Sequence, residues 1–365
     1  MSATNSSNGG PLKKRPGAPV RTLVFTSVAL GLALFLSAGP SFGQSAAVTT
    51  RGPKPSDVPA EWKSWLGDYG PNSALFTVGE DHGHLFVTAK LFRTCVLSGP
   101  LNDRVRGQCG TARTPVSLEK DSAGHLELKV DQVSFQKRPY GVDPQNVARI
   151  TPVRPLDELR REALAAVPPE EKGPFRKTDL VELAPLDPAI HLDIRYASSD
   201  DFLGAPVYTE ARAFLQRPAA EALVRALHRL QPHGYGLLIH DAYRPWYVTK
   251  IFWDATPQEG KIFVADPAQG SRHNRGCAVD LTLYDLKTGK PIEMTGAYDE
   301  MSPRSHPTYP GGTSLERWHR DLLRWAMESE GFAVYEYEWW HFDYKDWREY
   351  AIGNIPFEKL DAFKN

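Results

Sequence analysis

The sequence has almost no excess of charge of either sign, few cysteines and no hydrophobic run of full membrane-spanning length. Its 43 Lys and Arg residues balance 44 Asp and Glu residues, which gives a net charge of −1 over 365 residues. This balance argues against a nucleic-acid partner and against a polybasic membrane-surface protein. A hydrophobic content of 41% is ordinary for a globular protein, and the length allows two domains.

The N-terminal residues 1–46 have the order of a secretory signal peptide. A basic cluster at 13–21 precedes the apolar stretch 23–38, and small residues follow it. We expect cleavage after Gly43 or Ala46. The apolar stretch is short for a transmembrane helix, which needs about 20 residues, but an uncleaved anchor is the alternative. In both cases the body of the protein is expected to be exported, to the periplasm or the extracellular space.

Only three cysteines are present. Cys95 and Cys109 flank a connection that contains Gly, Pro and Asn, so a disulfide between them is reasonable in an oxidising compartment. Cys277 is left without a partner. Its position between Gly276 and Ala278 favours a small buried residue over a thiol nucleophile.

After a linker at 47–59, residues 60–150 are predicted to form a small all-β domain of unassigned role. His82 and His84 lie in a turn composition and are interpreted as surface residues of a hairpin. The short apolar runs that predict strands, each bounded by turn residues, are 74–79, 84–92, 115–120, 125–130 and 133–138.

A helical and Pro-rich linker at 151–175, with an amphipathic helix at 155–166, is predicted to precede a second domain at 176–365. Helices and strands mix in this domain without a repeating βαβ order, which indicates an α+β fold. The predicted helices are 217–234, 247–255 and 314–332, and the predicted strand segments are 235–245, 278–285 and 333–344.

Two short stretches of the second domain contain metal-ligand residue types. His273 and Asp280 flank a turn with Gly276, and His341 follows Glu338 by three residues. A catalytic zinc commonly takes three ligands from His, Asp, Glu and Cys and leaves one position to water. A regular strand would direct positions 338 and 341 to opposite faces, so this pair can share a site only if a bulge, bend or turn intervenes.

The order of motifs in 176–365 resembles the zinc D-alanyl-D-alanine dipeptidases of the vancomycin-resistance (VanX) type. That family is related to D,D-carboxypeptidases and to the hedgehog-like zinc fold, which the resemblance implies for this domain. The motifs that carry the resemblance are Ser271-x-His273 followed by Asp280, Glu338-x-x-His341, the segment 195–208 and the Asp-x-x-Arg-Pro turn at 241–245.

The resemblance implies a role for each matching residue. His273, Asp280 and His341 would hold one Zn²⁺, and Glu338 would act as general base toward the attacking water. Arg244 would stabilise the developing oxyanion. The implied activity is hydrolysis of D-alanyl-D-alanine, as part of cell-wall peptide metabolism.

The resemblance also implies a polar cluster for the substrate's free ammonium group, formed by Tyr196, Asp241, Ser271 and Asp299. Such a cluster favours a free D,D-dipeptide over a longer chain, whose acylated nitrogen carries no charge. One departure from the family pattern is Asp201, where an Asn is frequent.

Two other functions fit the same metal ligands. A peptidoglycan D,D-carboxypeptidase would cleave stem peptides, and a zinc-bearing binding module would not turn over substrate. The presence of both Glu338 and Arg244 argues against the second. The domain at 60–150 is a candidate for contact with the cell wall.

Overall fold

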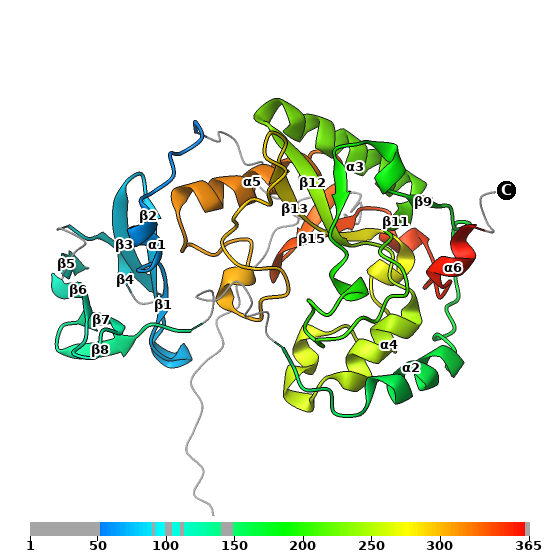
Figure 1. The fold of residues 1–365 in the computed structure, drawn as a ribbon, viewed down its shortest axis with the longest axis horizontal. Coiled ribbons are helices and arrows are strands. Elements are labelled where there is room, and N and C mark those ends of the chain that lie inside the picture. Colours follow the sequence, from blue (N-terminus) through cyan, green and yellow to red (C-terminus); the bar gives the residue numbers. More distant parts are fainter. Residues whose placement is uncertain (1–51, 90–91, 99–103, 110–112, 140–148, 362–365) are drawn as a thin grey trace, which may run out of the picture. The chain divides into compact units, whose positions relative to one another are not determined.

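A computed structural model describes residues 52–89, 92–98, 104–109, 113–139 and 149–361 (Figure 1). The signal peptide predicted at 1–46 lies outside the described residues. Among the described residues, no helix combines the length and the apolar composition needed to cross a membrane. Two separate hydrophobic cores are present, one built from residues between Trp65 and Leu128 and one from residues between Leu159 and Leu360.

The first core belongs to the predicted small β domain. Two four-stranded antiparallel sheets surround it, and a short helix α1 (Ala60–Lys63) precedes them. The strands of the first sheet are β1 (Gly67–Tyr69), β2 (Phe76–Asp81), β3 (His84–Ala89) and β4 (Phe92–Val96). Those of the second are β5 (Arg104–Cys109), β6 (Thr114–Lys120), β7 (Leu126–Val130) and β8 (Val133–Gln136).

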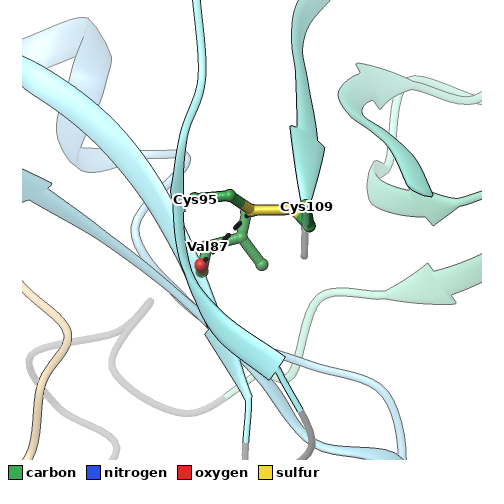
Figure 2. Close-up of a disulfide and its surroundings, with 3 residues drawn as sticks. All are labelled: Val87, Cys95 and Cys109. Carbon is green, nitrogen blue, oxygen red and sulfur yellow. Dashed lines mark hydrogen bonds between the residues drawn. A yellow bond between two sulfur atoms is a disulfide. The ribbon is translucent and has the colours of Figure 1, made fainter. Parts of the chain in front are cut away.

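The disulfide between Cys95 and Cys109 is confirmed (Figure 2). It joins β4 of one sheet to β5 of the other across a Cα–Cα distance of 5.2 Å. Strand β5 was not predicted, because its sequence RVRGQC has two arginines and no run of apolar residues. The run predicted at 84–92 is divided between β3 and the start of β4. His84 begins β3 beside the exposed turn residue His82, as expected for a hairpin.

The second unit is built on a five-stranded sheet, and its α+β class is confirmed. Only the pairing of β10 with β12 is parallel, and the others are antiparallel. In spatial order the strands are β10 (Ile190–Leu192), β12 (Tyr235–Asp241), β13 (Ala278–Asp285), β15 (Glu338–Tyr344) and β14 (Phe332–Tyr335). A separate pair is formed by β9 (Leu180–Glu182) and β11 (Phe214–Gln216).

Two amphipathic helices pack against this sheet and against each other (Figure 1). Helix α3 (Arg217–Leu230) buries an Ala and Leu stripe, and the chain leaves it through Gly234, whose φ of 87° suits glycine. Helix α5 (Ser314–Glu328) begins with a capping box between Thr313 and Glu316. The other helices are α2 (Leu156–Ala165), α4 (Trp246–Ala255) and α6 (Phe357–Leu360).

Alternation along β13 separates the core from the site. Val279, Leu281 and Leu283 are fully buried in the hydrophobic core, whereas Asp280 lines a cavity. Successive side chains of a strand point to opposite faces, so β13 supplies core residues on one face and a polar group on the other. The bounds of this strand are those predicted.

The segment predicted as one strand at 333–344 is instead a hairpin. The chain reverses at residues 336–337, so that β14 and β15 pair antiparallel. The pairing register shifts between Val334 and Tyr335, whose partners on β15 are Phe342 and Glu338. Residues 339–341 therefore have no partner on β14. This irregularity is the bulge that Glu338 and His341 need in order to share a site.

Candidate metal centre and cavity

Three side chains that are distant in sequence converge where β13 pairs with β15. Asp280 of β13 lies opposite His341 of β15, and His273 comes from the loop before β13. The Nδ1 atom of His341 lies 2.9 Å from Oδ1 of Asp280 and 3.1 Å from Nε2 of His273, and that Nε2 lies 3.4 Å from the same Oδ1. All three residues are buried. Within the described residues they form a cluster whose geometry could hold a metal ion.

The loop before β13 fixes the orientation of His273. This residue begins a short 3₁₀ turn that ends at Gly276, whose φ is 67°. The left-handed backbone favours glycine there, and a Cβ atom would approach Cδ2 of Leu180 to 2.6 Å, so any other residue would have to displace that side chain. The Nδ1 atom of His273 donates to the carbonyl of Ala242 at 2.7 Å, which leaves Nε2 unprotonated toward the cluster.

A carboxylate two residues further along β15 fixes His341. The Nε2 atom of His341 donates to Oδ1 of Asp343 at 3.0 Å, and Oδ2 of Asp343 accepts from Arg272 at 2.6 Å. The ring proton therefore lies on Nε2, and Nδ1 is free to bind a cation. Such outer carboxylates orient histidine ligands and increase their basicity.

These donor atoms fit zinc. A tetrahedral ion with bonds of about 2.0–2.2 Å separates its ligand atoms by about 3.3 Å, close to the spacings in the cluster. Two neutral imidazoles and one carboxylate leave a net positive centre and a fourth position for water. When bound, zinc would lower the pKa of that water toward neutrality.

Glu338 lies beside the cluster without joining it. Its Oε2 atom is 3.8 Å from Nδ1 of His341, and the side chain is partly exposed to the cavity. Burial, together with the negative charge of Asp280, raises the pKa of Glu338, although the two histidines oppose the shift. A carboxylate with a raised pKa is a suitable proton acceptor and donor near neutral pH.

Arg244 is held rigidly at the cavity wall. Its Nε and Nη2 atoms both donate to Oδ2 of Asp241, at 2.9 and 2.7 Å. The other oxygen of Asp241 accepts from the hydroxyl of Tyr208 at 2.6 Å. Asp241 lies behind Arg244, outside the cavity lining, so its contacts are those of a residue that positions the guanidinium.

The other three residues implied for the ammonium group, Tyr196, Ser271 and Asp299, line the cavity. The hydroxyl of Tyr196 donates to Oδ2 of Asp299 at 2.9 Å. Asp299 adopts a left-handed backbone with φ of 56°. Burial and the nearby charge of Asp280 raise the pKa of Asp299 well above its ordinary value.

The cavity that these residues line has a volume of about 760 Å³. Its wall includes three apolar side chains that are largely exposed to solvent: Ile262 at 82%, Phe263 at 51% and Tyr337 at 52%. Pockets for drug-sized ligands usually have volumes of about 300–1,000 Å³. The volume of this cavity lies in that range and is larger than a dipeptide with two methyl side chains requires.

Several residues of the site were not predicted. Asp343 follows His341 by two positions, and strand alternation could have indicated that both share a face. Tyr208 ends the segment 195–208 that carries part of the resemblance, but no role was implied for it, and Tyr298 had no sequence signal, because its contact with Asp280 depends on tertiary packing. Cys277 is fully buried and outside the cavity lining, in agreement with a packing role.

A mixed α+β fold that brings two histidines and an aspartate together, with a further carboxylate beside them, has the arrangement that metal-dependent hydrolases use. Comparison with known proteins specifies the family. Residues 176–355 match the family described as D-ala-D-ala dipeptidase. The chain belongs to this D-alanyl-D-alanine dipeptidase family, whose members are zinc metallopeptidases.

Individual relatives agree with this assignment. A D-alanyl-D-alanine dipeptidase of Escherichia coli K12 is 36% identical over 175 residues, which cover 48% of this chain and 89% of that protein. An Enterococcus faecium protein of the same name is 36% identical over 182 residues, which cover 44% of this chain and 90% of that protein. A Streptomyces coelicolor protein of that name is 36% identical over 175 residues, which cover 43% of this chain and 87% of that protein.

Proposed function

We propose that this protein is an exported dipeptidase that hydrolyses free D-alanyl-D-alanine to D-alanine with one zinc ion held by His273, Asp280 and His341. The observation that carries the proposal is the position of Glu338 and Arg244. Both line the cavity into which the metal-ligand atoms face. The names of the relatives support the choice of substrate.

In the proposed mechanism, Glu338 accepts a proton from the water that attacks the peptide carbonyl. As the C–N bond breaks, the same carboxyl group delivers that proton to the leaving amine. Arg244, held by Asp241, donates hydrogen bonds to the oxygen on which negative charge develops. The His273 and His341 side chains keep their ring protons on the outward nitrogens throughout.

Selectivity for a free dipeptide is assigned to Tyr196, Ser271 and Asp299, which surround the position of the substrate ammonium. A charged ammonium pairs with Asp299, whereas an acylated nitrogen does not. Asp299→Asn should therefore raise KM for the free dipeptide and leave an N-acetylated substrate little affected. An equal effect on both substrates would contradict this assignment.

A peptidoglycan D,D-carboxypeptidase is the second candidate, because the cavity is larger than D-alanyl-D-alanine requires. D-Alanine release should be measured for the zinc-loaded protein with D-alanyl-D-alanine and with its N-acetyl derivative. We expect turnover of the free dipeptide that disappears with a chelator and returns with zinc. Preferential turnover of the acetylated compound would assign the protein to the carboxypeptidases. Zinc binding without turnover of either would indicate the binding module.

Export is supported by the signal-like segment 1–46 and by the disulfide between Cys95 and Cys109, since structural disulfides persist in oxidising compartments. We also assign the 60–150 domain to contact with the cell wall and the 176–365 domain to the hedgehog-like zinc fold. Expression of the full chain in a bacterium, followed by fractionation and N-terminal sequencing, tests export. Recovery of the uncleaved protein in the cytoplasm would contradict it.

A further inference from the structure

A tyrosine that the proposed mechanism does not use contacts the metal centre directly. The hydroxyl of Tyr298 donates to Oδ2 of Asp280 at 3.1 Å. The other carboxylate oxygen, Oδ1, faces the ring nitrogens of His273 and His341. The two oxygens of Asp280 are thus distinguished by their partners: one faces the ion position and the other faces Tyr298.

The hydroxyl of Tyr196 is a second acceptor for the single Tyr298 proton, at the same distance of 3.1 Å. Tyr196 in turn donates to Asp299, in the group of residues proposed to bind the substrate ammonium. Tyr298 is therefore the link between a metal ligand and the ammonium subsite. Sequence motifs did not single it out, although it immediately precedes Asp299.

Packing fixes the ring of Tyr298. It stacks on His240 with a centroid distance of 4.6 Å and an interplanar angle of 28°, and its ring meets that of Trp340 edge to face at 5.5 Å. The side chain is 8% exposed. A buried ring held on two sides keeps its hydroxyl at one place, so the contact with Asp280 is pre-organised.

We propose that Tyr298 is a positioning residue for zinc: its hydroxyl orients Asp280 so that Oδ1 alone faces the ion, and couples that ligand through Tyr196 to the ammonium subsite. The inference rests on the proposed function in that it assumes zinc at His273, Asp280 and His341. It adds a residue and a coupling between two subsites.

The test is the zinc dissociation constant of the full-length protein, measured by competition with a chromophoric chelator. Tyr298→Phe removes only the hydroxyl and should raise Kd about 10- to 100-fold, the usual effect of losing a partner of a metal ligand. Tyr196→Phe removes a second acceptor for the Tyr298 proton and should change Kd by a smaller factor, with no further change in a Tyr298→Phe background, because Tyr196 acts on the metal ligand through Tyr298.

Tyr235→Phe is the matched control. Its buried hydroxyl bonds to His319 at 2.8 Å, on the same sheet but outside the cavity lining, and its loss should leave zinc affinity unchanged. A Tyr298→Phe Kd within about twofold of the wild type, or additive effects of the two substitutions, would overturn the proposal.

Thermal melts of the metal-free proteins show whether each variant is folded. If Tyr298→Phe does not fold, Tyr196→Phe alone decides, and an unchanged Kd overturns the coupling. A wild-type protein that binds no zinc would contradict the proposed function as well. Zinc binding without dipeptide hydrolysis would contradict the proposed function alone, since the affinity measurement needs no turnover.

Discussion

His341 and Asp343 share one face of β15, and Nε2 of His341 donates to Oδ1 of Asp343 at 3.0 Å. This bond determines which nitrogen of His341 can bind a metal. If the carboxylate were absent, the ring proton could occupy either nitrogen, and only one of the two tautomers would remain a ligand.

Asp343→Asn is therefore expected to raise the zinc Kd about 10- to 100-fold while the protein stays folded. Chelator competition measures the change. Asp346→Asn is a suitable control, because Asp346 pairs with Arg176 near the surface. Equal affinities for the two variants would show that Asp343 does not orient the ligand.

Glu338→Gln should reduce kcat by about 10²- to 10⁴-fold, because an amide cannot accept the water proton at neutral pH. Zinc content should be unchanged, since Glu338 lies 3.8 Å from the ligand atom of His341 and is not itself a ligand. Metal analysis beside steady-state kinetics separates the two effects. Glu336→Gln, at the hairpin turn, should retain activity. Loss of zinc from Glu338→Gln would instead identify Glu338 as a ligand.

Arg244→Lys should lower kcat by the equivalent of about 2.7–4 kcal/mol, the usual cost of losing one oxyanion donor. A lysine ammonium cannot reproduce two donors to Asp241 while a third faces the substrate. Steady-state kinetics should show the loss mainly in kcat. The surface substitution Arg225→Lys, at an exposed ion pair with Glu330, should have no effect. A change confined to KM would assign Arg244 to ground-state binding.

Asp201 should make stability depend on pH. Its side chain is buried, and Oδ2 has no hydrogen-bond partner within the described part of the chain. Burial raises the pKa of Asp201 to about 6. Against an unfolded pKa of about 3.9, the folded protein holds the extra proton, so its stability falls as pH rises from about 4 to 6.

Asp201→Asn should remove this loss, worth about 2–3 kcal/mol. The free energy of unfolding of the variant, relative to wild type, should increase by that amount between pH 4 and pH 7. Denaturant unfolding at both pH values measures it, with the exposed Asp200→Asn as control. A constant difference across the range would show that Asp201 titrates normally.

The sequence predicted those helices and strands whose hydrophobic pattern lies within the element itself. The alternation at 278–285 and the apolar stripe of 217–230 lie within single elements, and the combination of motifs, with the resemblance, indicated His273, Asp280 and His341 as ligands. The resemblance placed Arg244 and Asp299 at the cavity.

What could not be predicted depends on contacts between distant segments. The hairpin reversal at 336–337 occurs inside a continuous aromatic pattern with no Gly or Pro to mark it. The direction of the Asp241 side chain could not be predicted either, because it depends on Tyr208, which comes from another loop. Both the turn and the orientation are products of tertiary packing.

The bulge in β15 has a consequence for how this protein can vary. Glu338 and His341 reach the same cavity only because three residues, 339–341, lie unpaired opposite β14. Deleting Trp339 or Trp340 would shorten this unpaired stretch and shift Glu338 relative to His341 and to β14, even if every other side chain were kept. The hairpin should thus accept many substitutions but no change of length. Functional relatives should therefore differ in the residues of this hairpin and not in their number.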